Sequence, residues 1–216
     1  MKLIVGLLIL ILVSCSGKPY EEPAESAIII MLDSIISETA RYKGSQKLIY
    51  TNNSPETLHK VFYHLYFNAF QPGSEMAVRL KNSADKNGRF KVSVDSLSVE
   101  EQGFLRVSNV TQDGHYVSTE DSETILEVTL NTPLGPGQST TLELNFQGQV
   151  PDVVRRAGKN SSEGVAFSMA QWYPKMAEYD IDGWNSDPYT GREFHGVWGD
   201  FDVKIILDKE FTVAAS

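Results

Sequence analysis

Cysteine is nearly absent from this sequence. The 216 residues contain one, Cys15, so no disulfide can form within the chain, and a zinc site built from several cysteines is excluded. Clusters of lysine and arginine are also missing, and the net charge is −9, from 19 basic and 28 acidic residues. Because nucleic-acid binding depends on clustered basic side chains, we expect no nucleic-acid partner.

No apolar run is long enough to cross a bilayer as a helix. The longest, residues 3–13, would span about 15 Å, half of the hydrocarbon core. It follows Lys2 and precedes small residues, which is the arrangement of an export signal. Its end, the tetrapeptide Leu-Val-Ser-Cys at 12–15, resembles the lipobox of bacterial lipoproteins, in which the cysteine is lipidated.

These features predict three segments. We expect residues 1–15 to be a lipoprotein signal peptide that ends at the lipidated Cys15, and residues 16–26 to be a flexible tether. Residues 27–216 would be a folded domain, exported and anchored in a membrane of the bacterial periplasm or outer membrane. The alternative is a simple cleaved signal with a chance cysteine.

Catalytic motifs are missing as well. The four histidines are His59, His64, His115 and His195, and none belongs to an H-E-x-x-H zinc motif. The serine-nucleophile motif G-x-S-x-G is also absent. We interpret the histidines as core or surface side chains and expect no metal and no catalytic residue in this chain.

What the sequence does contain is a series of short alternating segments separated by Gly and Pro turns. Apolar residues make up 41% and charged residues 22%, as in an ordinary soluble domain. The pattern predicts an all-β, antiparallel, sandwich-like fold. We expect strands at 27–32, 47–51, 58–67, 90–99, 103–110, 115–117, 124–130, 140–146, 201–207 and 211–215.

Three of these segments carry further expectations. A helix over 28–40 is the alternative to the first strand, because its isoleucines also fall near one helical face. Residues 76–87 could form a short helix, and residues 148–164 are expected to be a loop. In the segment 201–207, Phe201, Val203, Ile205 and Leu207 are expected to point inward, and they alternate with Asp202, Lys204 and Ile206.

All three tryptophans, Trp172, Trp184 and Trp198, fall in residues 166–203, which we call the aromatic loop. Turn residues separate them, so the segment is expected to be an ordered, packed loop with a function. Within it, Asp180–Asp187 alternates acidic residues with a glycine turn, which could favour calcium. The order is not that of an EF-hand, and we interpret the segment as a turn held by aspartate caps and packed Trp184.

The aromatic loop also carries a family resemblance. Its motifs are F-S-M-A-Q-W-Y-P-K-M at 167–176, G-W at 183–184, D-P-Y at 187–189 and G-D-F-D-V-K-I at 199–205. Three upstream segments carry the same resemblance: Y-T-N-N-S at 50–54, Y-H-L-Y-F-N-A-F at 63–70 and L-G-P-G-Q-S at 134–139. Together they resemble the N-terminal β domain of the gluzincin zinc aminopeptidases, in the exported bacterial branch, over nearly all of residues 27–216.

The resemblance implies a saddle-shaped β domain packed on a zinc-containing catalytic domain. In that family, a Gln or Glu of the motif F-[ST]-x-x-[QE] hydrogen-bonds the free α-amine of the peptide substrate; here the matching residue is Gln171. The family's zinc helix and its G-x-M-E-N strand are absent from this sequence. We therefore expect this chain alone to be non-catalytic, with zinc held in a catalytic domain of the parent protein, which would be a metallopeptidase.

Two functions remain open at this point. In the first, the domain covers the active-site cleft of an aminopeptidase-like lipoprotein and helps to bind the substrate N-terminus. In the second, it is a stand-alone, membrane-tethered β-sandwich whose tryptophans bind a sugar or a peptide. Exposed coplanar tryptophans would favour the second function, and packed ones the first.

Overall fold

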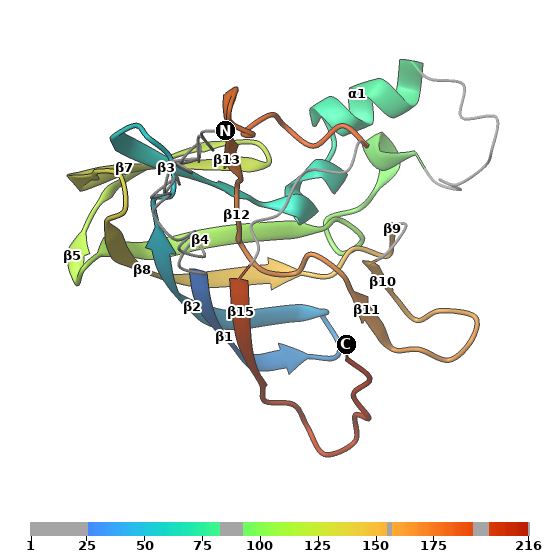
Figure 1. Cartoon of the computed structure of the whole chain (residues 1–216). Helices are drawn as coiled ribbons and strands as arrows, with labels where there is room; N and C mark the ends of the chain where they lie inside the picture. The colour runs from blue at the N-terminus through green and yellow to red at the C-terminus, as the bar shows by residue number, and fades with distance from the viewer. Residues whose placement is uncertain (1–25, 83–92, 155–156, 192–198, 216) are drawn as a thin grey trace, which may run out of the picture.

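The computed structural model describes residues 26–82, 93–154, 157–191 and 199–215. Its largest element is a six-stranded sheet (Figure 1), with strands in the order β15 (Gly199–Ile205), β1 (Ser26–Ile36), β2 (Arg41–Thr51), β8 (Ser139–Gln149), β4 (Phe104–Gln112) and β5 (His115–Tyr116). A four-stranded sheet has the order β12 (Lys175–Met176), β3 (Leu58–His64), β7 (Ile125–Leu134) and β6 (Ser118–Ser122).

Smaller elements complete the fold. One short sheet contains β11 (Phe167–Met169), β10 (Ala157–Lys159) and β9 (Val153–Val154), and a two-stranded ribbon contains β13 (Tyr179–Asp180) and β14 (Gly183–Trp184). The helical elements are α1 (Glu75–Asn82) and the 3-10 turns η1 (Tyr66–Phe70) and η2 (Val94–Ser96).

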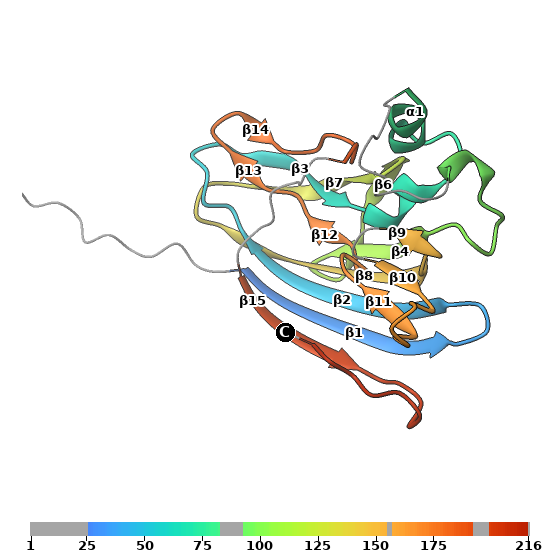
Figure 2. The ribbon, with the colours of Figure 1, turned by 90° about the vertical axis from the view of Figure 1, so that its right-hand side faces the viewer.

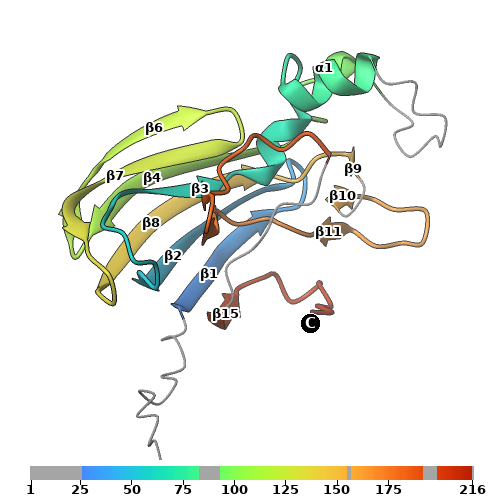
Figure 3. The same ribbon diagram turned by 45° about the horizontal axis from the view of Figure 1, so that its top comes forward.

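The two larger sheets form the layers of a sandwich. Figure 2 shows the six-stranded sheet curving beneath β3, β7 and β6. Within the described ranges the strand pairings are antiparallel, except that of β1 with β15, which is parallel and lies at the edge of the sheet (Figure 3). The prediction of an all-β, sandwich-like fold is confirmed.

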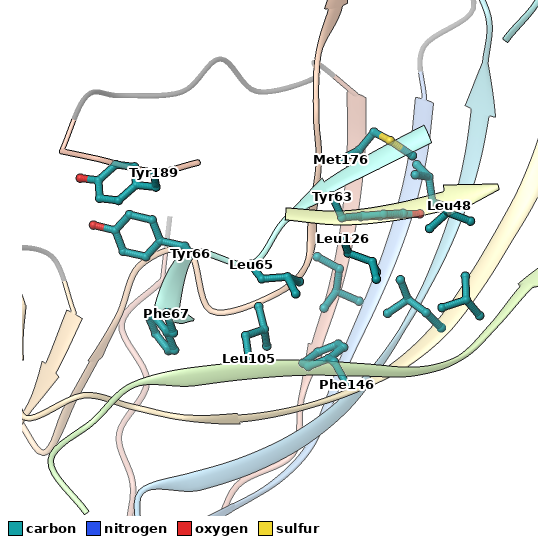
Figure 4. Close-up of a cluster of buried hydrophobic side chains, with 14 of the residues drawn as sticks. Leu48, Tyr63, Leu65, Tyr66, Phe67, Leu105, Leu126, Phe146, Met176 and Tyr189 are labelled. Atoms are coloured by element: carbon teal, nitrogen blue, oxygen red, sulfur yellow. The ribbon is translucent and has the colours of Figure 1, made fainter. Parts of the chain in front are cut away.

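Period-two alternation places the core. In β2 the even-numbered side chains such as Tyr42 and Leu48 are buried, and the odd-numbered ones from Arg41 to Ile49 point outward. In β8 Leu142, Leu144 and Phe146 are buried on the same side. Figure 4 shows Phe146 and Leu48 together with side chains from the opposite layer, so the core lies between the two sheets.

Several strand predictions are confirmed with longer bounds. Residues 27–32 belong to β1, so the helix considered over 28–40 is wrong. The strand predicted from residue 47 begins at Arg41, because pairing with β8 extends through polar residues that have little intrinsic preference for strands. Strand β6 has five exposed polar residues, and no apolar alternation marked it in the sequence.

Other expectations are wrong. The strand predicted over 58–67 ends at His64, and η1 follows, which lets Tyr66, Phe67 and Phe70 all enter the core. Residues 93–99 of the strand predicted over 90–99 contain η2 and a turn. Residues 211–215 form no strand, and the loop predicted over 148–164 contains β9 and β10.

Candidate functional site

The aromatic loop is fastened to the four-stranded sheet through its backbone. Strand β12 pairs with the end of β3, with Lys175 opposite His64 and Met176 opposite Tyr63. Next along the loop, the amide of Ala177 donates a hydrogen bond to the carbonyl of Phe62 at 2.8 Å. Residues 175–177 therefore continue the four-stranded sheet beside β3.

A second set of contacts fastens the loop to the six-stranded sheet. The Tyr42 hydroxyl donates to the carbonyl oxygen of Trp172 at 2.6 Å, and the Gln46 amide donates to that of Pro174 at 3.0 Å. The Trp172 ring packs against the rings of Tyr42 and Phe146, with centroids 6.2 and 6.0 Å away. Residues 172–174 are thus fixed between the layers.

Further along, Trp184 is packed in the same manner. Its ring lies 5.2 Å from Tyr179, 5.6 Å from Phe62 and 6.1 Å from Tyr50, measured between centroids. Trp172 and Trp184 are both partly buried against the core. They are packed rather than displayed, which supports the interpretation of an ordered, packed loop; Trp198 lies outside the described residues.

Thr124 joins the loop to the chain reversal at η1, and sequence analysis missed it. Its carbonyl oxygen accepts a hydrogen bond from the Leu65 amide at 2.7 Å, and its hydroxyl oxygen accepts one from the Tyr189 amide at 2.9 Å. The Tyr189 ring then lies 4.7 Å from that of Tyr66 (Figure 4). A single buried threonine before a strand gives no sequence signal of this role.

Gln171 lies between β11 and the fixed segment that begins at Trp172. Its φ is +61°, a left-handed conformation that is uncommon for residues other than Gly, Asn and Asp. The side chain is half-buried, and its amide makes no hydrogen bond to any residue in the described part of the chain. The amide oxygen is therefore available to accept a hydrogen bond from a ligand.

Among the residues that the structure describes, Ala40 and Glu123 are the other two with positive φ that are not Asn, Asp or Gly. Each lies in the tight turn of a hairpin, where the chain reversal requires that conformation. Gln171 lies in the turn at residues 170–171 that follows β11, and not between two paired strands.

His64 is buried at the end of β3. Burial lowers its pKa to about 4, and the nearby Lys175 acts in the same direction, whereas the backbone of Asn185 and the carboxylate of Asp187 act in the opposite one. An imidazole in this environment is neutral near pH 7. His59 and His115 are exposed, and His195 lies outside the described residues.

The acidic segment of the loop forms the turn between β13 and β14. One carboxylate oxygen of Asp180 accepts the Asp182 amide at 2.8 Å, and the other accepts the Asn185 side-chain amide at 2.9 Å. This agrees with a turn held by an aspartate. In the described ranges, no three Asp, Glu, His or Cys side chains come together in a way that could hold a metal ion.

Strand β15 differs from the strand predicted over 201–207 in its bounds and in its burial. It spans Gly199–Ile205, so Leu207 lies just beyond it, partly buried against the core. Its register with β1 places Phe201, Val203 and Ile205 opposite Ile28, Ile30 and Leu32, which belong to the core, so the predicted facing is right. These three side chains are not buried as predicted, however, since they are 44%, 45% and 36% exposed. The reason is position: β15 is the edge strand, and the four-stranded sheet does not extend over it (Figure 3).

The membrane-related expectations fall outside what the structure describes. The described residues begin at Ser26, so they include neither the signal segment 1–15 with Cys15 nor the rest of the tether. Among the described residues, no helix is both long and apolar enough to span a bilayer.

Among known proteins, the chain is similar to solved structures of an M1 zinc metallopeptidase from Deinococcus radiodurans. A mutant bound to a Tyr-Ser-Ala substrate is 17% identical with a TM-score of 0.45, covering 85% of this chain and 32% of that chain. The unmutated protein is 16% identical with the same TM-score and the same coverage. A further mutant structure is 18% identical with a TM-score of 0.40, covering 68% of this chain and 27% of that one.

This chain therefore spans less than a third of the length of the proteins that it matches in structure. They are zinc metallopeptidases, the class of protein that the sequence motifs resemble. No protein-family model and no curated protein matches the chain.

Proposed function

We propose that this chain is the non-catalytic N-terminal domain of an exported zinc aminopeptidase-like lipoprotein. In this function the domain covers the active-site cleft, and Gln171 helps to bind the free α-amine of the peptide substrate. Cys15 would carry the lipid that anchors the protein to the membrane. Catalytic zinc would belong to the catalytic domain of the parent chain, which is the partner of this one.

The conformation of Gln171 is the observation that carries the proposal. Holding a glutamine at positive φ costs on the order of 1 kcal/mol, and such strain persists where the surrounding structure enforces it. Here the enforcing contacts begin at the next residue, Trp172, whose carbonyl and ring are both fixed by Tyr42. The strained backbone therefore sets the position of the Gln171 side chain, and that side chain makes no hydrogen bond to any described residue.

The chemistry of that side chain suits an ammonium ligand. The substrate amine donates hydrogen bonds, and the amide oxygen of Gln171 is a neutral acceptor. An α-ammonium group carries three hydrogens and a positive charge, whereas an internal peptide nitrogen carries one hydrogen and no charge. The amide oxygen would therefore form the stronger hydrogen bond with the chain end. In the parent enzyme, zinc and a glutamate base would activate water for attack on the first peptide bond.

Strand β15 supplies a surface for the catalytic domain. Phe201, Val203 and Ile205 continue the core face of the sheet but are half-exposed. Apolar side chains aligned on one strand face favour burial against a second protein surface, by about 25 cal/mol for each Å² removed from water. Docking of the catalytic domain here would bury them.

The first experiment measures the size of the natural protein. An antibody raised against residues 166–203 should detect a membrane-associated band far above 24.0 kDa, the mass of this chain. A band near that mass, less the signal segment, would contradict the proposal and favour the stand-alone binding module.

The second experiment tests Gln171 in the intact parent protein. Gln171→Ala should lower kcat/KM for peptides with a free α-amine by about tenfold or more, since it removes a hydrogen bond to a charged group. Gln171→Glu keeps an acceptor and should retain most of the activity. Ser162→Ala, in the exposed connection between β10 and β11, is the matched control. Unchanged kinetics for Gln171→Ala would remove it from the substrate site.

A further inference from the structure

The outer face of the six-stranded sheet, which points away from the core, carries two adjoining pockets of about 190 and 210 Å³. Both are lined by Arg41, Phe104 and Gln147, so they form one continuous hollow at the end of the sheet near the β1–β2 turn. Arg106 lines the first pocket and Lys43 the second. Among the described residues, no acidic side chain lines either of them.

Strand register brings these side chains together. Arg41 of β2 is opposite Gln149 of β8, which is opposite Phe104 of β4. In the same way Lys43 is opposite Gln147, which is opposite Arg106. Residues directly opposite each other share a face of the sheet, so two rows of side chains lie next to each other on the outer face.

The two arginines are held in place before any ligand arrives. Both guanidinium groups lie over the ring of Phe104, with the Cζ atom of Arg106 at 4.7 Å and that of Arg41 at 5.9 Å from its centroid. The Nε of Arg41 also donates to the side-chain oxygen of Gln149 at 3.0 Å.

Gln149 is itself immobilised. It is buried, and its amide nitrogen donates to the carbonyl oxygens of Val99 and Gln102 at 2.8 and 2.6 Å. Because Nε of Arg41 is the atom used, the two terminal nitrogens of its guanidinium group remain to bind a ligand. A fixed arginine loses little side-chain entropy when it binds.

The charge of the hollow has no counterion in the part of the chain that the structure describes. There, no carboxylate lies within 4.0 Å of the charged nitrogens of Arg41, Lys43 or Arg106. Lys47, on the same face of β2, is by contrast paired with Glu143 at 3.6 Å. Three unpaired cations in one hollow are unusual for a chain with a net charge of −9, and they repel one another until an anion joins them.

We propose that this hollow is a binding site for a phosphate group, held by the guanidinium forks of Arg41 and Arg106, the ammonium of Lys43 and the side-chain amide of Gln147. Arginine forks match the oxygens of a tetrahedral oxyanion, and charge-assisted hydrogen bonds of this kind are the stronger ones. The phosphate could belong to a soluble phosphate compound or to the headgroup of a phospholipid.

The first test is calorimetric titration of the folded chain with inorganic phosphate, at an ionic strength kept constant with sodium chloride. We expect saturable binding at one site, weakened about tenfold or more by Arg106→Gln and by Arg41→Gln. Lys47→Gln removes a cation from the same face but outside the hollow, and it should bind as the original chain does. Equal affinity in all three variants would overturn the proposal.

A second test separates the two sources of phosphate. Vesicles of phosphatidylglycerol and phosphatidylcholine are compared with vesicles of phosphatidylcholine alone in a flotation assay with unlipidated protein. Flotation with the first kind only, abolished by Arg106→Gln, assigns the site to a lipid headgroup. Phosphate binding without flotation assigns it to a soluble phosphate, and the absence of both overturns the site.

The variants also need a control for folding. Arg106 is exposed and makes no hydrogen bond within the described residues, so Arg106→Gln should unfold at the same temperature as the original chain. Arg41→Gln removes the donor to the buried side-chain oxygen of Gln149 and should unfold at a lower temperature, so Arg106→Gln carries the binding test. The outcome is independent of the proposed peptidase function, because the site lies on the outer face of the sheet, and Arg106→Gln should leave peptide cleavage by the parent protein unchanged.

Discussion

The hydroxyl of Tyr42 donates a hydrogen bond of 2.6 Å to the carbonyl oxygen of Trp172, a residue 130 positions later in the chain. Tyr42 is buried in β2, and burial raises the pKa of its phenol well above the usual value, so it remains a donor at any physiological pH. This contact fixes the segment that follows Gln171. It links the core of the sandwich to the candidate substrate-binding residue.

Replacing Tyr42 by phenylalanine tests that link. The variant keeps the ring contacts with Phe146 and Trp172 but leaves the carbonyl of Trp172 without its donor. Loss of one partner from a buried hydrogen bond should lower the free energy of unfolding by about 1–3 kcal/mol, measured by urea denaturation. Tyr116→Phe, on an exposed tyrosine, is the control and should have no effect.

A glycine beneath the same ring is also expected to be essential. A Cβ atom added at Gly148 would lie 2.1 Å from the Cζ atom of Tyr42. Because the ring is enclosed by the core, it cannot move aside, and Gly148→Ala should lower the free energy of unfolding by about 1–3 kcal/mol. Asn145→Ala changes an exposed residue of the same strand and should be nearly neutral. A stable Gly148→Ala variant would show that the ring can move.

The buried His64 predicts a dependence of stability on pH. Its pKa is lowered to about 4 in the folded state from an ordinary value of 6.5, so between these values the unfolded chain binds more protons. Stability should therefore fall as the pH is lowered from 6.5 to 4, by roughly 3 kcal/mol in total from this residue.

Substitution separates this contribution from those of the carboxylates that titrate in the same range. His64→Gln should flatten the curve of unfolding free energy against pH, and His59→Gln, on the exposed side of the same strand, should not. Parallel curves for all three proteins would show that His64 does not remain neutral in the folded state.

The Asp180 turn can be tested apart from the rest of the loop. Asp180→Ala removes the acceptor of the Asp182 amide and of the Asn185 side chain. Because both hydrogen bonds are exposed, losing each should lower the free energy of unfolding by at most about 1 kcal/mol. We expect faster hydrogen exchange in residues 179–187 and little change elsewhere. Asp182→Ala keeps both hydrogen bonds and is the control. Slowing of exchange in this turn by added calcium would instead favour the metal site considered from the sequence.

Local pattern was enough to predict much of this fold. Alternation in β7 and β8 predicted the sandwich, because a strand with one buried face must alternate apolar and polar side chains. The packed character of the aromatic loop followed from dense aromatics separated by turns. Gln171 was selected from the motif around it, and nothing in the sequence indicated its left-handed backbone.

Other features have no local signature. Residues 64–70 continue the aromatic composition of β3, yet the chain leaves the sheet there, because three aromatic side chains enter the core from a 3-10 turn. Thr124 is an unremarkable residue in sequence, and its two hydrogen bonds exist only because η1 and the aromatic loop meet at it.

By itself, then, the sequence determined which residues alternate, where the chain turns and which motif surrounds Gln171, because each of these depends on neighbours within a few positions. Only the tertiary structure decided which residues of neighbouring strands lie opposite each other. Strand register placed Arg41, Phe104 and Arg106 in one hollow, and the edge position of β15 left Phe201, Val203 and Ile205 half-exposed although their pattern is that of a core strand. Burial and charge pairing depend on contacts between residues far apart in the chain, and pairing between distant strands is what sets them.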